Sequence, residues 1–268
     1  MSEYVLGTSD HELERLELQS RVWRGPTEDF LAGLDLLPGS KALDLGCGPG
    51  HVIESLCDRV GPTGLVTGVD ESPRWIAELE STARGRGWSN VRAVRARLQE
   101  LELEPGSQDL VFLRWVLSFL PRPAELLRHF GRWLRPGGIL AVFDYNHEGI
   151  SLFPESEGFR AVVRATRSLY ASKGGDAFVM GRIERHFVEA GFEPFLLRPY
   201  VLAGAPDTPA FRWADAFFPY HSAGMVQAGA LTVEERRLFL EEWEARKGDP
   251  TSLFFSPIVV GAAARKPE

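Results

Sequence analysis

Apolar residues follow two patterns along the chain: short unbroken apolar runs, and longer stretches with apolar positions at helical spacing. The unbroken runs predict buried strands, and the helically spaced stretches predict amphipathic helices between them. The predicted strands cover residues 41–45, 64–70, 90–96, 109–115, 139–145, 192–202 and 252–264. The predicted helices cover residues 10–23, 27–37, 51–60, 73–85, 122–134, 158–171, 181–191 and 232–246. Strands that alternate with helices along the chain are typical of nucleotide-binding α/β folds.

The stretch Lys41–Gly50 reads Lys-Ala-Leu-Asp-Leu-Gly-Cys-Gly-Pro-Gly, a buried strand that runs into a glycine-dense turn. A turn without side chains lets a ligand approach the backbone, and the next helix points its N-terminal amides at that ligand. The dinucleotide fingerprint needs its third glycine three residues after the second. Here Gly46, Gly48 and Gly50 are spaced two and two apart, and His51 occupies the required position. The spacing argues against an NAD site.

A carboxylate ends the second predicted strand. The stretch 64–70 is apolar up to Asp70, which comes twenty residues after Gly50. Nucleotide-binding α/β folds place an acidic residue at this distance and use it to bind ribose hydroxyls. Asp70 is therefore the predicted ribose ligand.

Two motifs in this region resemble those of the class I S-adenosylmethionine-dependent methyltransferases of the small-molecule or natural-product type. The family's first motif is an acidic residue, any residue, then Gly-x-Gly-x-Gly, and Asp44 with the three glycines matches it in full. A second hallmark, Leu-Arg-Pro-Gly-Gly, occupies residues 134–138, so that the resemblance covers about residues 40–146. It implies S-adenosyl-L-methionine as cofactor. It also implies an α/β fold with a doubly wound, seven-stranded, mostly parallel, Rossmann-like sheet and a helical lid.

The resemblance further implies which residues contact the cofactor. They lie in the glycine turn and at strand ends: Asp44, Gly46, Cys47, Gly48, Gly50, Asp70, Glu71, Leu98, Gln99 and Arg114. One position departs from the family pattern. The family often has an acidic residue that accepts a hydrogen bond from the adenine amine where this chain has Gln99, so Gln99 or a backbone carbonyl would accept that bond here.

We expect residues 1–268 to form a single domain with a core and a lid. The core covers about residues 38–146, 178–204 and 252–266, and the lid comes from residues 8–37, 147–175 and 205–250. In relatives of this type the N-terminal helices close over the cofactor, which makes Gln19, Arg21 and Trp23 candidate contacts. Packing and surface charge alone would also explain these three residues.

The acceptor is expected at the carboxyl ends of the fourth and fifth strands, where open parallel sheets bind ligands. The residues predicted to bind it are Trp115, Tyr145, Asn146 and, from the insertion before the last strand, Tyr220. A core role would also explain Trp115. His147, just past the fifth strand, is the candidate catalytic base, although a loop or capping histidine would fit the same position. His221 is a second candidate base.

The composition limits the classes of partner. The 268-residue chain has a formal net charge of −7 and no Lys/Arg cluster, so nucleic acid has little electrostatic attraction to it. Cys47 and Cys57 fit neither a disulfide framework nor a zinc pattern, and no segment approaches the ~18 apolar residues of a membrane span. The N-terminus shows no targeting signal. We expect a cytoplasmic protein that binds a small-molecule acceptor, no nucleic acid and no membrane; the sequence leaves its oligomeric state open.

No metal site is predicted. Asp144 and Asn146 are similar to metal ligands of catechol-type methyltransferases. A hard cation such as Mg²⁺ would also need a carboxylate at the end of the fourth strand, where this chain has Arg114 and Trp115.

A sulfonium methyl group is already activated, so an enzyme of this family mainly holds donor and nucleophile in line and excludes water. In some cases it also removes a proton from the acceptor. The predicted function is methyl transfer to a small, apolar or aromatic acceptor, with O-methylation as the leading reaction. Two alternatives stay open: a family member that binds the cofactor but catalyses a rearrangement or cyclisation, and a catalytically silent cofactor-binding protein.

Overall fold

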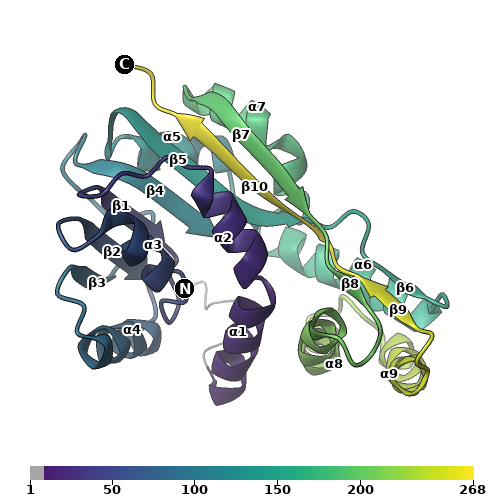
Figure 1. Cartoon of the computed structure of the whole chain (residues 1–268). Coiled ribbons are helices and arrows are strands. Elements are labelled where there is room, and N and C mark those ends of the chain that lie inside the picture. The colour runs from purple at the N-terminus through teal and green to yellow at the C-terminus, as the bar shows by residue number, and fades with distance from the viewer. Residues whose placement is uncertain (1–8) are drawn as a thin grey trace.

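The computed structural model describes residues 9–268, and Figure 1 shows how their helices and strands are arranged. The prediction that the N-terminus carries no targeting signal concerns mainly residues 1–8, which lie outside the described range. Within that range, no helix has the length and apolar character that crossing a bilayer requires.

A seven-stranded sheet forms the centre of the molecule, with the strand order β3-β2-β1-β4-β5-β10-β7. Its strands are β1 (Lys41–Leu45), β2 (Leu65–Asp70), β3 (Val91–Arg95), β4 (Gln108–Arg114), β5 (Leu134–Asn146), β7 (Glu193–Tyr200) and β10 (Ile258–Arg265). The strands β1 to β5 pair in parallel, and β10 pairs antiparallel with both β5 and β7. The predicted doubly wound, mostly parallel sheet is confirmed.

Most helices fall where the sequence predicts them. They are α1 (Asp10–Val22), α2 (Arg24–Ala32), α3 (Ile53–Val60), α4 (Pro73–Arg86), α5 (Pro123–Gly131), α6 (Glu157–Ser172), α7 (Ile183–Ala190), α8 (Pro209–Gln227) and α9 (Val233–Gly248). Two short 3-10 helices, η1 (Leu117–Phe119) and η2 (Val179–Arg182), lie in the loops.

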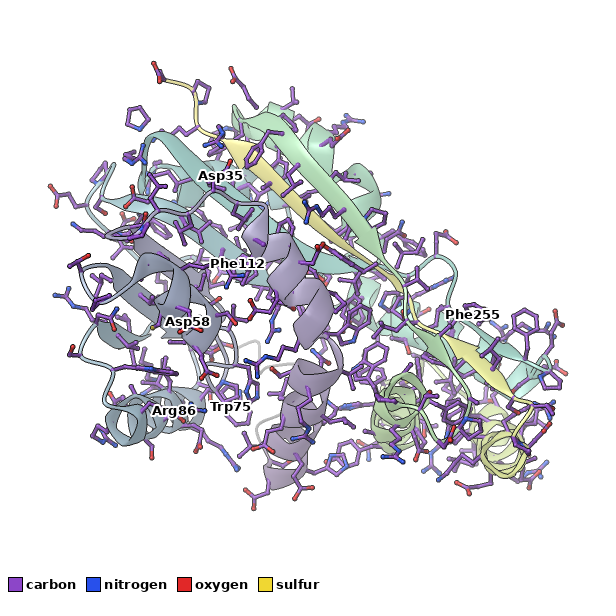
Figure 2. All side chains as sticks on the ribbon, in the orientation of Figure 1. Asp35, Asp58, Trp75, Arg86, Phe112 and Phe255 are labelled. Atoms are coloured by element: carbon purple, nitrogen blue, oxygen red, sulfur yellow. The ribbon has the colours of Figure 1, made fainter. Side chains whose placement is uncertain are left out.

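Helices cover both faces of the central sheet because successive strand residues point to opposite sides. The helices α2, α3 and α4 share one hydrophobic core with Ala42 and Phe112. The helices α5 and α7 share the other with Leu43 and Val111. Figure 2 shows Phe112 beneath α2, where the Phe30 ring centre lies 6.5 Å from that of Phe112. This two-sided burial explains the unbroken apolar runs of β1 and β4.

Serine side chains cap the starts of α1 and α4. The Ser9 hydroxyl accepts a hydrogen bond from the backbone N–H of Glu12 at 3.2 Å and begins α1. The Ser72 hydroxyl caps α4, and Pro73 follows at its first position, where a missing N–H costs no hydrogen bond.

A second, three-stranded sheet continues one half of the central sheet. Its strands β6 (Ser151–Phe153), β9 (Leu253–Phe255) and β8 (Ala203–Gly204) have the order β6-β9-β8. They adjoin β5, β10 and β7 in the chain and repeat the order of those strands. The helices α6, α8 and α9 pack beside this sheet through Phe159, Phe211 and Trp243, and α1 packs against α8 (Figure 1).

The structure corrects the extent of the predicted lid. The prediction assigns all of residues 8–37 to it, but α2 packs on the central sheet, with the Phe30 ring 5.8 Å from that of Phe143. The helix predicted over 27–37 also starts earlier and ends at Ala32. Of the two N-terminal helices, α1 packs against the lid helix α8.

The insertion at residues 205–250 holds two helices, whereas the sequence analysis predicts one. The prolines explain why α8 is not predicted, because proline usually argues against a helix. Here Pro209 occupies the first turn, where proline is tolerated, and Pro219 lies inside the helix. The single strand predicted over 252–264 is likewise divided at Ser256 and Pro257 into β9 and β10.

Candidate functional site

A cavity of about 510 Å³ opens at the carboxyl ends of β1, β2, β4 and β5, the edge that the sequence predicts. One end, here called the turn end, is lined by residues from the 44–52 turn, the end of β2, Trp75 and residues 96–100. The other, here called the lid end, is lined by side chains from α1, η1, β5, α6 and α8 together with Trp115.

The three glycines of the turn are required for different reasons. Gly46, Gly48 and Gly50 all have positive φ, of 70°, 55° and 89°. A Cβ on Gly46 would lie 2.4 Å from Val116 Cγ2, and a Cβ on Gly50 would lie 2.6 Å from Leu79 Cδ1. A Cβ on Gly48 would meet no atom of the described chain within 4 Å. Protein packing therefore explains the outer two glycines, whereas Gly48 leaves room for a ligand.

Asp70 is held in a fixed orientation at the end of β2. Its Oδ2 accepts a hydrogen bond from the backbone N–H of Gly48 at 3.0 Å, and its Oδ1 accepts one from that of Ser72 at 2.9 Å. Burial raises the pKa of Asp70, and these two hydrogen bonds oppose the rise. Each carboxylate oxygen can accept a further hydrogen bond, so the side chain is suited to a pair of hydroxyl groups.

Asp44 and Arg114 place opposite charges at the ends of β1 and β4. Asp44 is buried, and its Oδ2 has no hydrogen-bond partner within residues 9–268. Burial raises the pKa of Asp44 to about 7, an effect that Arg114 opposes. Burial likewise lowers the pKa of Arg114 to about 10, opposed by Asp44. A cationic ligand group beside Asp44 would satisfy the unpartnered oxygen and favour its ionised form.

Cys47 and His51 line the turn end as uncharged groups. Burial raises the pKa of the Cys47 thiol, so the thiol stays protonated, and its Sγ lies 3.4 Å from the Gly48 carbonyl oxygen. Burial lowers the pKa of His51 to about 4, and Arg114 and Arg21 act in the same direction. Both side chains therefore shape the wall without adding charge at neutral pH.

The turn end continues along residues 96–100, which follow β3. Leu98 and Gln99 line the cavity there, and Glu71 lines it next to Asp70. Trp75 also lines it, although helical spacing predicts only a buried position on α4. A residue can belong to a helix's buried stripe and still form a cavity wall, which the spacing alone does not reveal.

Trp115 and Tyr145 meet at the lid end, at the strand ends where the sequence places them. Their ring centres are 5.9 Å apart and their planes are 20° from parallel. Trp115 has a φ of 55°, a left-handed conformation that is rare for a large side chain. Contacts with Trp23 and Phe143, at ring distances of 6.3 and 6.0 Å, hold the indole in place. Such strain persists where the surroundings fix it, as is common at binding sites.

Several lid-end residues have no signal in the sequence that marks them as part of a site. They are Arg15, Leu16, Phe119, Leu120, Tyr170, Lys173 and Phe217. They come from α1, η1, α6 and α8, which only the folded chain brings together. Of the three candidate contacts in the N-terminal helices, Gln19 lines this cavity.

Two predicted acceptor contacts lie away from the cavity wall. Tyr220 is 47% exposed and stacks on His11, with ring centres 3.7 Å apart. Phe217, one turn earlier on α8, takes the wall position instead. Asn146 is also outside the wall, and its Oδ1 accepts a hydrogen bond from the backbone N–H of Glu148 at 3.3 Å.

His147 lies behind the wall that Tyr145 and Tyr170 form. Its ring centre is 5.5 Å from that of Tyr145 and 5.4 Å from that of Tyr170, and the side chain is buried. Burial lowers its pKa to about 3, and Arg167 adds to the effect. A base has to reach the proton that it removes, so this position does not favour His147 as the base. His221 has a pKa lowered to about 3, mainly by burial, and also lies outside the wall.

Asp144 stabilises the backbone at the end of β5. It is fully buried, and its oxygens accept hydrogen bonds from the backbone N–H groups of Ser118 at 3.1 Å and Tyr145 at 2.7 Å. It thereby fastens the segment after β4 to β5. Across residues 9–268, no group of three or more His, Cys, Asp or Glu side chains is arranged to hold a metal ion. Metal independence stays a prediction.

Sequence comparison gives one matching family and several relatives. A family model described as a methyltransferase domain matches residues 43–142. An uncharacterised 37.1 kDa protein in transposon TN4556 of Streptomyces fradiae is 36% identical over 192 residues, which are 70% of this chain and 51% of that protein. Trans-aconitate 2-methyltransferase of Methylobacterium nodulans is 39% identical over 117 residues, 44% of this chain and 43% of that enzyme. The chain thus spans about half the length of these relatives.

Solved structures show the same fold. A protein of Bacillus halodurans provisionally named a methyltransferase superposes with a TM-score of 0.63 at 20% identity. The match covers 90% of this chain and 98% of that one. The segment matched by the family model runs from β1 into β5 and includes Asp44, the glycine turn, Asp70 and Arg114.

Proposed function

The chain belongs to the class I S-adenosylmethionine-dependent methyltransferases, and we propose that it transfers a methyl group from S-adenosylmethionine to a small-molecule acceptor. The observation that carries this proposal is the turn end of the cavity. There Gly48 faces open space, Asp70 presents two oriented oxygens, and Asp44 has an oxygen without a partner.

The residues of the turn end fit this cofactor chemically. Asp70 would accept hydrogen bonds from the ribose hydroxyls, and Asp44 would neutralise the ammonium group of the methionine part. Arg114, half-buried near Asp44, would hold the carboxylate, and Leu98 and Gln99 would border the adenine. When bound, the sulfonium supplies a methyl group already activated for attack by a nucleophile.

The lid end supports a small apolar or aromatic acceptor. Its wall is formed largely by the rings of Trp115, Phe119, Tyr145, Tyr170 and Phe217. Aromatic walls with a few polar groups are typical of sites for organic ligands. The helices α1 and α8 cover this end, so the protein's task is to orient the acceptor and exclude water. The proposed reaction is O-methylation, in the cytoplasm and without a nucleic-acid or membrane partner.

A methyl-transfer assay tests the proposal. Purified protein is incubated with S-adenosylmethionine labelled in its methyl group and a panel of phenols, enols and carboxylic acids. We expect label in at least one acceptor, lost in Asp70→Ala and kept in Asp58→Ala, which removes an exposed carboxylate of α3. Binding of the cofactor without any chemistry would favour a silent binding protein. A rearranged product without label would favour the cyclase-like alternative.

A further inference from the structure

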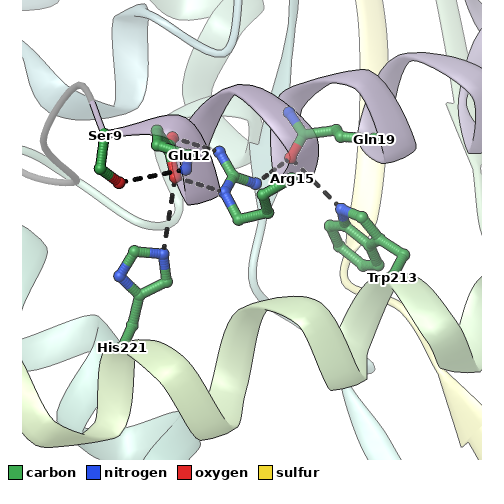
Figure 3. Close-up of polar contacts among 6 residues, drawn as sticks. All are labelled: Ser9, Glu12, Arg15, Gln19, Trp213 and His221. Carbon is green, nitrogen blue, oxygen red and sulfur yellow. Dashed lines mark hydrogen bonds and ion pairs between the residues drawn. The ribbon is translucent and has the colours of Figure 1, made fainter.

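A polar network between α1 and α8 fixes the orientation of one amide at the lid end (Figure 3). Gln19 Oε1 accepts hydrogen bonds from Arg15 Nη1 at 2.7 Å and from Trp213 Nε1 at 3.2 Å. Guanidinium and indole groups are donors only, so the amide oxygen has to face them. Figure 3 shows the Gln19 nitrogen turned away from Trp213.

The same network keeps Arg15 in position. Its Nε and Nη2 donate hydrogen bonds to the two carboxylate oxygens of Glu12 at 2.8 and 2.7 Å, and both side chains are buried. Removing one partner of a buried ion pair leaves an uncompensated charge, which makes such a pair hard to rearrange. The Gln19 amide is therefore held by a rigid partner and does not flip.

Gln19 lines the cavity, and only its N–H groups remain to meet a ligand. Within residues 9–268, no protein group accepts a hydrogen bond from Gln19 Nε2. Trp115 also lines this cavity, but its Nε1 is itself buried and has no partner among the described residues, so the Gln19 amide is the donor that the wall presents. The rings of Trp213, Trp23 and Trp115 form a row from Gln19 to the strand ends, with centres 5.6 and 6.3 Å apart.

Charged side chains divide the cavity in the same way. Among residues 9–268, the carboxylates on its wall are Asp44, Asp70, Glu71 and Glu100, all at the turn end. The charged residues that line the lid end are Arg15, whose charge Glu12 balances, and the exposed Lys173. Donors and cations stabilise an ionised oxygen and lower the pKa of its parent hydroxyl.

We propose that the acceptor is a small aromatic or conjugated compound with an acidic hydroxyl, which binds as an oxyanion whose oxygen accepts a hydrogen bond from the Gln19 amide. This inference rests on the proposed function. The hydroxyl proton leaves to solvent on binding. The oxyanion lone pair then forms the new carbon–oxygen bond, while the carbon–sulfur bond breaks and its electron pair stays on sulfur. No protein base is needed, in keeping with a His147 that lies behind the wall.

The probe for this inference is 4-nitrophenol, whose ionised form is seen by its visible absorbance. Its methyl ether, 4-nitroanisole, is the control ligand without an ionisable oxygen. Both are titrated into protein saturated with S-adenosylhomocysteine. We expect the protein to bind the phenolate and to lower the pH of half-ionisation of the probe by about one unit or more. Absence of saturable phenolate binding, or an unshifted ionisation, would overturn the proposal.

Gln19→Glu is the decisive variant because it keeps an oxygen for Arg15 and Trp213 and turns the remaining donor into an acceptor. We expect phenolate binding to weaken about 10- to 100-fold and 4-nitroanisole binding to change less than about twofold. Gln227→Glu, the same change at the exposed end of α8, controls for the added charge and should leave both affinities unaltered. Equal losses for the two ligands, or no loss, would contradict the assignment.

Titration calorimetry with S-adenosylhomocysteine separates this inference from the proposed function. If the unmodified protein fails to bind it, the proposed function is wrong. If the unmodified protein binds it and Gln19→Glu does not, Gln19 belongs to the cofactor's site and the inference is wrong. Trp213→Phe removes one of the two donors that orient Gln19 and should weaken phenolate binding about threefold while cofactor affinity is kept.

Discussion

The two ends of the cavity are built in opposite ways. The turn end is made by backbone and side chains from three short segments, residues 44–52, 70–75 and 96–100, together with Arg114 at the end of β4. The lid end is made by side chains from segments between Arg15 and Phe217. Groups at the turn end take their positions from the sheet, whereas groups at the lid end take theirs from helix packing.

Hydrogen bonds between β1 and β2 show how the sheet positions the turn end. The backbone N–H groups of Gly46 and Cys47 donate to the carbonyl oxygen of Val69 at 2.8 and 3.0 Å. The next donor, Gly48, bonds to the Asp70 side chain. The pairing of β1 with β2 thus continues into the site. A short sequence motif is therefore enough to specify the geometry of the turn end. Within residues 9–268, no comparable series of backbone hydrogen bonds connects α1 to α8.

The largest expected effect comes from Gly48→Val. The added side chain would occupy the ligand's space and not that of a protein neighbour, so affinity for S-adenosylhomocysteine should fall at least about 10³-fold in calorimetry. Gly87→Val is the matched control, because Gly87 has a similar φ of 68°, equally open surroundings and a place outside the cavity. If both variants lose stability but keep affinity, the turn is structural only.

Asp70→Ala should weaken binding of the same ligand by about 10- to 10³-fold, because it removes one or two hydrogen bonds to a charged group. Phenolate binding at the lid end, measured at saturating cofactor product, should stay unchanged. Unaltered calorimetry for Asp70→Ala would disprove the ribose assignment.

Asp44 should make cofactor affinity depend on pH. Its pKa is raised to about 7, so binding of an ammonium group beside it should weaken about tenfold per pH unit below that value. The same shift means that the ligand-free protein loses stability as pH rises from 3.8, the ordinary pKa, to about 7. Asp44→Asn should therefore raise the melting temperature at pH 8 but not at pH 4, and flatten the affinity profile. A steep profile in Asp44→Asn would assign the titration to another group.

The smallest effect is expected for His147→Gln. Since the imidazole lies behind the lid-end wall, turnover with an identified acceptor should stay within about threefold, whereas loss of a general base costs about 10²–10⁴. A fall of that larger size, with cofactor affinity preserved, would restore His147 as the base.

The sequence locates most residues of the turn end because they belong to short segments at strand ends. Asp44, Gly48 and Asp70 line the cavity at the positions where the sequence analysis places them, and the central sheet follows from the alternation of predicted strands and helices. At the lid end the sequence identifies Trp115 and Tyr145, which also lie at strand ends.

The spacing of residues in the sequence does not predict the other lid-end residues, because their positions depend on tertiary packing. The prolines of α8 kept the sequence pattern from predicting this helix. Without the helix, the sequence does not indicate that Phe217 faces the cavity or that Tyr220 stacks on His11 outside it. His147 follows β5 directly, but the strand's last residues turn its ring behind Tyr145. Which face of a helix meets a cavity is decided by its packing partners.

The continuation of three strands from the central sheet into the small sheet affects how ligands enter. β5 continues as β6, β7 as β8, and β9 leads into β10, with cross-links such as the hydrogen bond from the Ser256 N–H to the Leu202 carbonyl oxygen at 2.8 Å. Three bonded strands resist bending together, so the helices α6, α8 and α9 are stiffly joined to the core. We therefore expect ligand exchange to require movement of α1, which contacts α8 through side chains such as Gln19 and Trp213. Amide hydrogen exchange should be faster in α1 than in α8; equal protection would mean that the whole lid moves as one.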